Sequence, residues 1–339
     1  MTENDKVIFT IIALGHLGDT ILVEPLCKNI KQQFPKSKII FITNKLFEEI
    51  ALGFESVDMV CGYDKRKKHK GILGFLKFTK EFPYKNKIDY AIITHPHERS
   101  IFTAKAIRAK NIISLPIKNS PLNLLINKKR NYNRNEIKNT FKGDFNSKYL
   151  SELCYYENLP VSYIRKDINY EEIRKKYNLP LHYTVLSPTS KEIIKDWDYN
   201  NIKEFIINNK YNTVLIGTEK ANKIAKILQK EGTKFIDLTN KTTITDLGAI
   251  IKMSDTCISV DTGTFHLSYA QNVKTIGLFF NKRMEREWVP KSTDITILEG
   301  KKYINNKQIV CEKNIKAQDV LKELEKLDYG KDKCLFNMR

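Results

Sequence analysis

The feature that most constrains this chain is a repeated alternation of short apolar segments with amphipathic helical patterns. In the first half, strands are expected at residues 7–14, 38–43, 57–60, 89–94 and 111–114, and in the second half at 183–187, 212–217, 234–238, 256–260 and 274–280. Such alternation is typical of βα units and parallel sheets. A chain of 339 residues suits two domains of about 150 residues each. We therefore expect an α/β protein with two doubly wound halves and a cleft where the carboxyl ends of their strands face each other.

The alternation is interrupted in the middle of the chain. Residues 115–145 are rich in Asn, Lys and Pro and are interpreted as a long, mobile connection. A helix is expected near 145–158, and the polar stretch 160–180 is expected to contain an interdomain linker. The pattern at 316–327 predicts a last helix. The expected organisation is therefore an N-terminal domain over 1–170, a C-terminal domain over 171–315, and a helix with a tail over 316–339.

The formal net charge of +19 indicates an anionic partner, such as nucleic acid, an acidic membrane surface or a phosphorylated substrate. A composition rich in Lys, Asn and Ile offers the alternative that lysine is raised throughout the chain. Two clusters exceed that background, KRKKHK at 65–70 and NKKRNYNRN at 127–135. The chain has no run of eighteen apolar residues, and its polar start does not resemble a signal peptide, so a cytosolic location is expected. The six scattered cysteines are interpreted as reduced thiols.

The first strand runs into a glycine turn and a helix within IIALGHLGDTILVEPLCKNI, with the helix expected over 20–34. A strand, a glycine turn and a helix N-terminus usually attract phosphate through backbone N–H groups. Here Gly15 and Gly18 are followed by Asp19, whose carboxylate would repel a phosphate. Asp19 is also a good helix N-cap, so a structural role is the alternative to a chemical one.

A similar turn occurs in the second half, in SVDTGTFHLSYA at 259–270. Gly263 allows close approach of the backbone to a ligand, and Thr262 or Thr264 can cap the helix while its N–H groups bind an anion. Asp261 is placed to accept hydrogen bonds from sugar hydroxyls. The turn is thus a candidate diphosphate site, with an ordinary capped turn as the alternative. His266 is expected in the core or behind the site.

A third candidate segment is SPTSKEIIKDWDYNNIKEF at 187–205. Ser187, Thr189 and Ser190 are hydroxyl donors at the carboxyl end of a strand, and Lys195 is a point charge suited to phosphate oxygens. Trp197 is expected to pack at the start of the next helix. The D-W-D of residues 196–198 matches a short manganese motif, but it lies at a helix start, where carboxylates are favoured anyway, and no metal site is expected.

These segments occur in a characteristic order: GDTILVEP, SPTS…KDW, IGTEKA, DTGTFHLSYAQNVKTIGLFF and EREWVP, together with ITHPHERSIFTAKAIRAKNI at 93–112. The ordered set resembles the family-9 glycosyltransferases, the ADP-heptose:lipopolysaccharide heptosyltransferases, over nearly the whole chain. The resemblance implies a GT-B fold, with the sugar nucleotide in the C-terminal half and the acceptor in the N-terminal half. It also implies inversion at the anomeric carbon without a metal. LFFNKRMEREW replaces the family's usual Phe-Gly-Pro-Thr turn.

The resemblance also implies roles for individual residues. Asp19 matches the general base, Lys195 the lysine that neutralises the donor phosphates, and Asp261 the residue that holds the donor heptose. The Gly263–Thr264 turn matches the diphosphate cradle, and Glu219 falls close to an acid that contacts the donor ribose. The expected donor-binding residues are Ser187, Thr189, Lys195, Glu219, Asp261, Thr262, Gly263 and Thr264.

An inverting transfer needs a base on the side of the sugar opposite the leaving group. A carboxylate on the acceptor domain meets this need, and Lys195 with a helix N-terminus can stabilise the departing diphosphate without a metal. His95 and His97 are rival bases or residues on the acceptor side. The basic cluster follows strand 57–60 and should emerge at the acceptor edge. The expected acceptor-binding residues are Gly18, Lys65, Arg66, Lys68, His97 and Arg99; a solvated surface is the alternative for each basic residue.

The resulting hypothesis is an enzyme that moves L-glycero-D-manno-heptose from ADP-heptose to an anionic, lipid-linked inner-core acceptor at the cytosolic face of the inner membrane. No cofactor is expected beyond the sugar-nucleotide co-substrate. One alternative is another nucleotide sugar or acceptor. A Rossmann oxidoreductase fits less well, because GHLGD lacks the GxGxxG spacing. A nucleic-acid-binding protein would explain the charge, but no aromatic-basic module is present.

Overall fold

The computed structural model describes residues 6–326, apart from 133, 164, 281–284, 293, 301, 306–307 and 312–313. The chain forms two compact units. The N-terminal unit comprises Met1–Lys166 together with Arg286–Pro290, and the C-terminal unit comprises Asp167–Glu285 and Lys291–Arg339. The sequence-based boundary was placed at residue 170. The return of a short segment near residue 288 to the N-terminal unit was not expected from the sequence.

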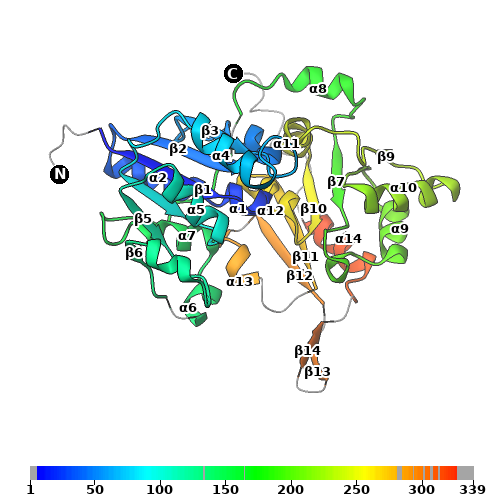
Figure 1. The fold of residues 1–339 in the computed structure, drawn as a ribbon. Helices are drawn as coiled ribbons and strands as arrows, with labels where there is room; N and C mark the ends of the chain where they lie inside the picture. The colour runs from blue at the N-terminus through cyan, green and yellow to red at the C-terminus, as the bar shows by residue number, and fades with distance from the viewer. Residues whose placement is uncertain are drawn as a thin grey trace. The chain divides into compact units, whose positions relative to one another are not determined.

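The N-terminal unit is built on a parallel sheet with the strand order β3-β2-β1-β4-β5-β6 (Figure 1). Its strands are β1 (Ile8–Ala13), β2 (Lys38–Asn44), β3 (Met59–Tyr63), β4 (Tyr90–Ile93), β5 (Asn111–Ser114) and β6 (Lys128–Lys129). The central strands are apolar on both faces because helices cover both sides of the sheet. This is the strand order of a Rossmann-type fold, and its order reverses between β1 and β4.

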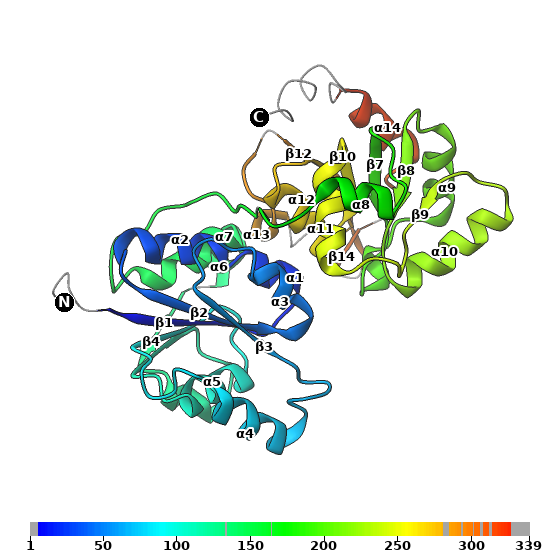
Figure 2. The ribbon, with the colours of Figure 1, turned by 90° about the horizontal axis from the view of Figure 1, so that it is seen from above.

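Helices lie on both faces of this sheet. Figure 2 shows α4 (Gly71–Glu81) and α5 (Glu98–Ala106) on one side, and α1 (Leu17–Ile21), α2 (Glu24–Gln33), α3 (Glu48–Ala51) and α7 (Lys142–Ser147) on the other. The unit also contains α6 (Arg134–Asn139) and the 3₁₀ turns η1 (Lys45–Phe47), η2 (Pro121–Leu125) and η3 (Lys148–Leu150). Most of α13 (Glu285–Trp288) belongs to this unit.

Three sequence-based expectations for this unit were wrong. The helix expected over 20–34 is two helices, α1 and α2, because Pro25 at the start of α2 has no N–H and its ring disfavours a continuous helix. Residues 115–145 are not one long irregular connection, since η2, β6, α6 and the start of α7 lie within them. The helix expected near 145–158 begins at Lys142 and gives way to turns after Leu150.

The C-terminal unit repeats the same architecture, with the parallel strand order β12-β11-β10-β7-β8-β9. Its strands are β7 (Tyr183–Ser187), β8 (Asn212–Leu215), β9 (Ile236–Asp237), β10 (Thr256–Val260), β11 (Lys274–Phe279) and β12 (Ile295–Glu299). A separate hairpin is formed by β13 (Lys302–Asn305) and β14 (Gln308–Cys311). Here the order reverses between β7 and β10.

The helices of this unit are α8 (Tyr170–Lys176), α9 (Tyr199–Asn208), α10 (Glu219–Lys230), α11 (Ile244–Met253), α12 (Gly263–Ala270) and α14 (Ala317–Lys326), with the 3₁₀ turn η4 (Ile193–Lys195). The last helix is part of the core, because Val320 and Leu324 of α14 pack in one cluster with Trp197. Trp197 is buried at the start of α9, as expected, and its indole N–H donates to the carbonyl of Ile315 at 2.9 Å.

Within the described residues, no helix is both long and apolar enough to cross a bilayer. Cys27, Cys61, Cys154 and Cys257 are free thiols, whereas Cys334 lies outside the described residues.

Candidate active site

The candidate residues of each unit lie at the carboxyl ends of the strands where its order reverses. Asp19 follows β1 and His95 follows β4, while Lys195 follows β7 and Asp261 follows β10. In open α/β sheets ligands bind outside the carboxyl ends of the strands at such a switch point. Each unit therefore presents its candidate residues where the topology itself predicts a ligand.

Asp19 lies in the first turn of α1, which His16 caps. Its Oδ2 accepts a hydrogen bond from the backbone N–H of His16 at 2.8 Å. The side chain of Asp19 is only 11% exposed. The carboxylate packs so closely against the preceding turn that a Cβ atom at Gly15 would collide with it. Gly15 therefore serves the placement of Asp19 rather than the approach of a phosphate.

Two titratable side chains from distant parts of the N-terminal unit, His95 and Lys142, interact with Asp19. Nδ1 of His95 lies 4.0 Å from Oδ1 of Asp19. Burial lowers the pKa of His95, although Asp19 opposes the shift. Burial also lowers the pKa of Lys142 on α7, while Asp19 and Glu287 of α13 act in the opposite direction. Sequence reasoning missed Lys142, because it belongs to no motif and only the fold brings it near Asp19; Glu287 lies in the EREWVP segment, but its effect on Lys142 was not predicted.

A pocket of about 180 Å³ opens beside His95 in the N-terminal unit. Its lining residues are Leu14, Asn44, Tyr63, Lys65, His95, His97 and Arg99. Nη1 of Arg99 donates to the hydroxyl of Tyr63 at 2.8 Å, which fixes the guanidinium. Nδ1 of His97 accepts from the backbone N–H of Arg99 and caps α5. Two cationic side chains, Lys65 and Arg99, thus line this pocket together with His95, which lies beside Asp19.

The structure does not bring all expected acceptor residues into this pocket. Arg66 and Lys68 are exposed on the preceding loop, and Lys68 pairs with Glu81 at 2.9 Å. Gly18 is buried within α1. In the second basic cluster, Arg130 is buried against Glu152 and the carbonyl of Tyr149, so this cation stabilises the fold. The clustering of basic residues in the sequence could not distinguish those that line the pocket from those that lie elsewhere.

In the C-terminal unit, Nζ of Lys195 lies 2.9 Å from Oδ2 of Asp261 and 3.2 Å from Glu192. The side chains of Lys195 and Asp261 are 11% and 10% exposed. Burial disfavours the ammonium form, but Asp261 and Glu192 outweigh burial and raise the pKa of Lys195. Lys195 is therefore a fully charged cation held in place at the edge of the sheet.

The turn after β10 lies beside this cation. Oγ1 of Thr262 accepts from the N–H of Thr264 at 3.3 Å and caps α12, which begins at Gly263. The hydroxyl of Ser187 donates to Oγ1 of Thr264 at 3.4 Å, so the ends of β7 and β10 are linked. Thr189 is also buried. Its hydroxyl oxygen faces Gly217, within ordinary contact distance of the position that a Cβ atom would take there. A helix N-terminus with capping hydroxyls and a buried lysine is suited to an anionic ligand.

Other candidate residues of this unit have structural partners. Glu219 is exposed at the start of α10, where it accepts from the side chain of Asn240 at 3.0 Å. Asp196 pairs with Lys220 at 3.0 Å, and Asp198 caps α9, so the two carboxylates of D-W-D have separate roles. His266 is buried, with Nδ1 2.9 Å from the Tyr269 hydroxyl. Among the described residues, no group of three or more His, Cys, Asp or Glu is arranged to hold a metal ion.

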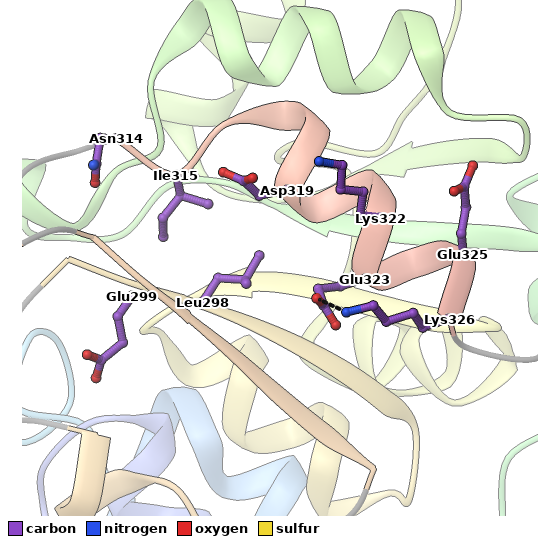
Figure 3. A pocket seen from close by; sticks show the side chains of 9 residues that line it. All are labelled: Leu298, Glu299, Asn314, Ile315, Asp319, Lys322, Glu323, Glu325 and Lys326. Carbon is purple, nitrogen blue, oxygen red and sulfur yellow. Dashed lines mark hydrogen bonds and ion pairs between the residues drawn. The ribbon is translucent and has the colours of Figure 1, made fainter.

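A separate pocket of about 600 Å³ lies between β12 and α14 (Figure 3). Leu298, Ile315 and charged side chains of α14 such as Asp319 and Lys322 line it, and Glu323 pairs with Lys326 at 2.7 Å at its edge. It contains none of the sequence-predicted site residues. The volume of a pocket therefore does not identify the candidate active site in this protein.

Two Rossmann-like units with candidate sites at both switch points are the architecture of the GT-B fold. A family model described as glycosyltransferase family 9 (heptosyltransferase) matches residues 88–324. The chain belongs to this family of transferases.

Individual relatives agree with this assignment. The lipooligosaccharide heptosyltransferase 2 of Campylobacter jejuni is 24% identical over 341 residues, which cover 92% of this chain and 95% of that protein. A family-9 glycosyltransferase from Veillonella parvula has a similar structure, with a TM-score of 0.83 at 20% identity, covering 96% of this chain and 98% of that one. The E. coli heptosyltransferase WaaC, solved with ADP-2-deoxy-2-fluoro heptose, has a TM-score of 0.71 at 16% identity, covering 94% and 99% of the two chains.

Proposed function

We propose that the protein is an inverting glycosyltransferase that transfers heptose from ADP-L-glycero-D-manno-heptose to a lipopolysaccharide or lipooligosaccharide inner-core acceptor. The observation that carries the proposal is the arrangement in the C-terminal unit, where the buried Lys195, its partner Asp261 and the capped N-terminus of α12 lie together. The names of the Campylobacter and E. coli relatives support heptose as the transferred sugar.

On the donor side, the proposed roles follow from charge. The departing ADP develops negative charge as the glycosidic bond breaks, and Lys195 with the N–H groups of α12 stabilises that charge. Asp261 accepts hydrogen bonds from the sugar hydroxyls. Ser187, Thr189, Thr262 and Thr264 supply hydroxyls along the same edge, and Gly263 leaves the backbone open to the diphosphate. Glu219 is proposed to contact the ribose.

On the acceptor side, Asp19 is the proposed general base. It takes the proton of the acceptor hydroxyl as that oxygen attacks the anomeric carbon from the face opposite ADP, which inverts the configuration. The pocket beside it, with Lys65, His97 and Arg99, is suited to carboxylates or phosphates of an inner-core sugar. Gly18, Arg66 and Lys68 remain proposed acceptor contacts from the sequence alone.

No metal or cofactor is included in the proposal, because Lys195 and the α12 N-terminus supply positive charge for the leaving group. A chelator should leave the transfer rate unchanged. A strict requirement for a divalent cation would contradict this part of the proposal.

The decisive test is incubation with ADP-heptose and a set of truncated inner-core acceptors, followed by mass spectrometry. We expect one acceptor to gain the mass of a single heptose residue. Gain of a different sugar from another nucleotide donor would support the alternative within the family. Salt-dependent binding of generic DNA without any sugar-nucleotide binding would contradict the proposal.

The proposed acceptor is linked to lipid, so we also propose that the enzyme works at the cytoplasmic face of the inner membrane. The expected location is the cytoplasm with peripheral contact to that surface. Fractionation of cells into soluble and membrane-associated protein, before and after a high-salt wash, tests this.

A further inference from the structure

We propose that residues 65–80, comprising the basic loop and most of α4, form a surface that docks on an anionic lipid bilayer. We name residues 65–80 the docking surface. The proposal goes beyond the transfer reaction, because it assigns the membrane contact to one element of the N-terminal unit. Its physical basis is independent of the sugar that is transferred.

The first observation is an apolar group exposed to solvent on α4. The exposed fractions of Ile72, Leu73 and Leu76 are 80%, 83% and 54%. Positions 72, 73 and 76 lie on one side of a helix, because residues three and four apart are neighbours on its surface. Gly71, the first residue of α4, has a φ of 68°, a conformation that favours glycine. Single exposed apolar side chains are normal, but a contiguous exposed group marks an interaction site.

The second observation is the charge around this apolar group. Seven exposed cations surround it in the sequence: Lys65, Arg66, Lys67, Lys68, Lys70, Lys77 and Lys80. Glu81 pairs with Lys68 at 2.9 Å, and Asp64 accepts from the backbone N–H groups of Arg66 and Lys67. The surface thus keeps a large excess of positive charge beside apolar side chains. Shallow insertion of apolar groups combined with attraction of lysines to anionic headgroups is how interfacial helices bind membranes.

The third observation is that the opposite face of α4 is firmly fixed to the unit. Phe78 and Phe82 belong to a buried core cluster. The ring of Phe78 lies 5.0 Å from the rings of both Tyr63 and His69. Helix α4 therefore presents its exposed side chains from a rigid support and not from a mobile loop.

The same contacts place the docking surface beside the proposed acceptor pocket. Tyr63 packs on Phe78 of α4, and its hydroxyl accepts from Arg99, which lines that pocket. A bilayer bound by α4 would therefore hold its headgroups near Arg99 and Lys65. If the protein has the proposed function, this arrangement suits an acceptor whose lipid part stays in the membrane.

The test is co-sedimentation of the full-length protein with vesicles of phosphatidylglycerol and phosphatidylethanolamine, compared with phosphatidylcholine vesicles. Two variants probe the surface: Ile72→Ser/Leu73→Ser/Leu76→Ser, and Lys67→Glu/Lys70→Glu/Lys77→Glu. The matched control is Lys223→Glu/Lys226→Glu/Lys230→Glu on α10, which makes the same change in net charge at exposed lysines of the other unit. We expect each α4 variant to lower partitioning into anionic vesicles by at least about tenfold and the control to leave it within about twofold.

Several outcomes would overturn the proposal. Equal losses in the α4 and α10 charge variants would show that net charge alone drives binding. Equal binding to phosphatidylcholine would remove the role of the lysines. Wild-type dimers that the apolar variant converts to monomers would make α4 a protein interface. A melting temperature unchanged from wild type confirms that each variant is folded. Vesicle binding by a protein that transfers no heptose would contradict the proposed function and leave the docking surface intact.

Discussion

The ammonium of Lys195 and the carboxylate of Asp261, which lie 66 residues apart in sequence, form a nearly buried ion pair with Nζ and Oδ2 2.9 Å apart. The pair joins η4 to the turn after β10 at the switch point of the C-terminal sheet. It keeps Lys195 charged, and it holds the cation beside the capped N-terminus of α12. The proposed donor site is thus assembled before a ligand arrives.

Replacing Lys195 with Gln should weaken ADP binding by at least about tenfold and slow transfer, since a hydrogen bond to a charged group contributes about 1.5–3 kcal/mol. The measurement is isothermal titration with ADP, followed by steady-state kinetics. Lys203→Gln is the matched control, because Lys203 also pairs with a carboxylate, that of Glu231 at 2.9 Å, but on α9. Unchanged ADP affinity in Lys195→Gln would remove this residue from the donor site.

Replacing Asp19 with Asn should reduce kcat by about 10²–10⁴-fold, the usual contribution of a general base. The amide oxygen of Asn can still accept from the N–H of His16, so the turn is preserved. ADP affinity should remain within about twofold of wild type. Full turnover by this variant would place the base elsewhere.

Gly15 gives a sharper test of how Asp19 is positioned. Gly15→Ala should lower activity strongly and cost about 1–3 kcal/mol of stability, because the new methyl group collides with the Asp19 carboxylate. In an Asp19→Ala background that carboxylate is absent, and the same substitution should cost little. A double-mutant cycle on the free energy of unfolding measures this coupling. Additive effects would contradict the proposed packing.

The position of His95 leads us to expect a specific pH dependence of the transfer activity. Burial lowers its pKa below the ordinary value of 6.5, so His95 is neutral at pH 7 and gains a proton only in more acidic solution. That charge would arise 4.0 Å from Asp19 and would hold it in an ion pair. Activity should therefore fall as the pH drops through the pKa of His95, and His95→Gln should retain more of its neutral-pH rate in acid. If His95→Gln abolishes transfer at all pH values, His95 is the rival base.

Much of the fold could be predicted because apolar periodicity reports burial. The strands around Asp19 and Asp261 were placed to within a residue or two, since parallel strands covered on both faces are continuous apolar runs. The short strand β6 and the helix α6 were missed, and α7 begins three residues before the helix expected near 145–158. Their polar, Asn- and Lys-rich sequence carries no apolar period, and they form by packing against the rest of the unit.

The candidate site likewise contains residues that local sequence marks and residues that only the tertiary structure brings in. Asp19 and Asp261 follow strands and glycine turns, and Lys195 follows a strand, so local sequence is enough to mark them as candidates. Lys142 comes near Asp19 only through tertiary structure, and no local pattern marks it. Among the basic residues, position in the sequence could not tell Arg99, which lines the pocket, from Arg130, which is buried in an ion pair.

The most direct test of the account is a thermal-shift panel of ADP-, GDP-, UDP- and CMP-sugars with the wild-type protein and Lys195→Gln. A ligand that binds only the folded state raises the melting temperature, and at equal ligand concentration a tighter ligand raises it more. The account predicts the largest rise with ADP-L-glycero-D-manno-heptose, and its loss in Lys195→Gln. A larger rise with another nucleotide sugar, or an equal rise in the variant, would contradict it.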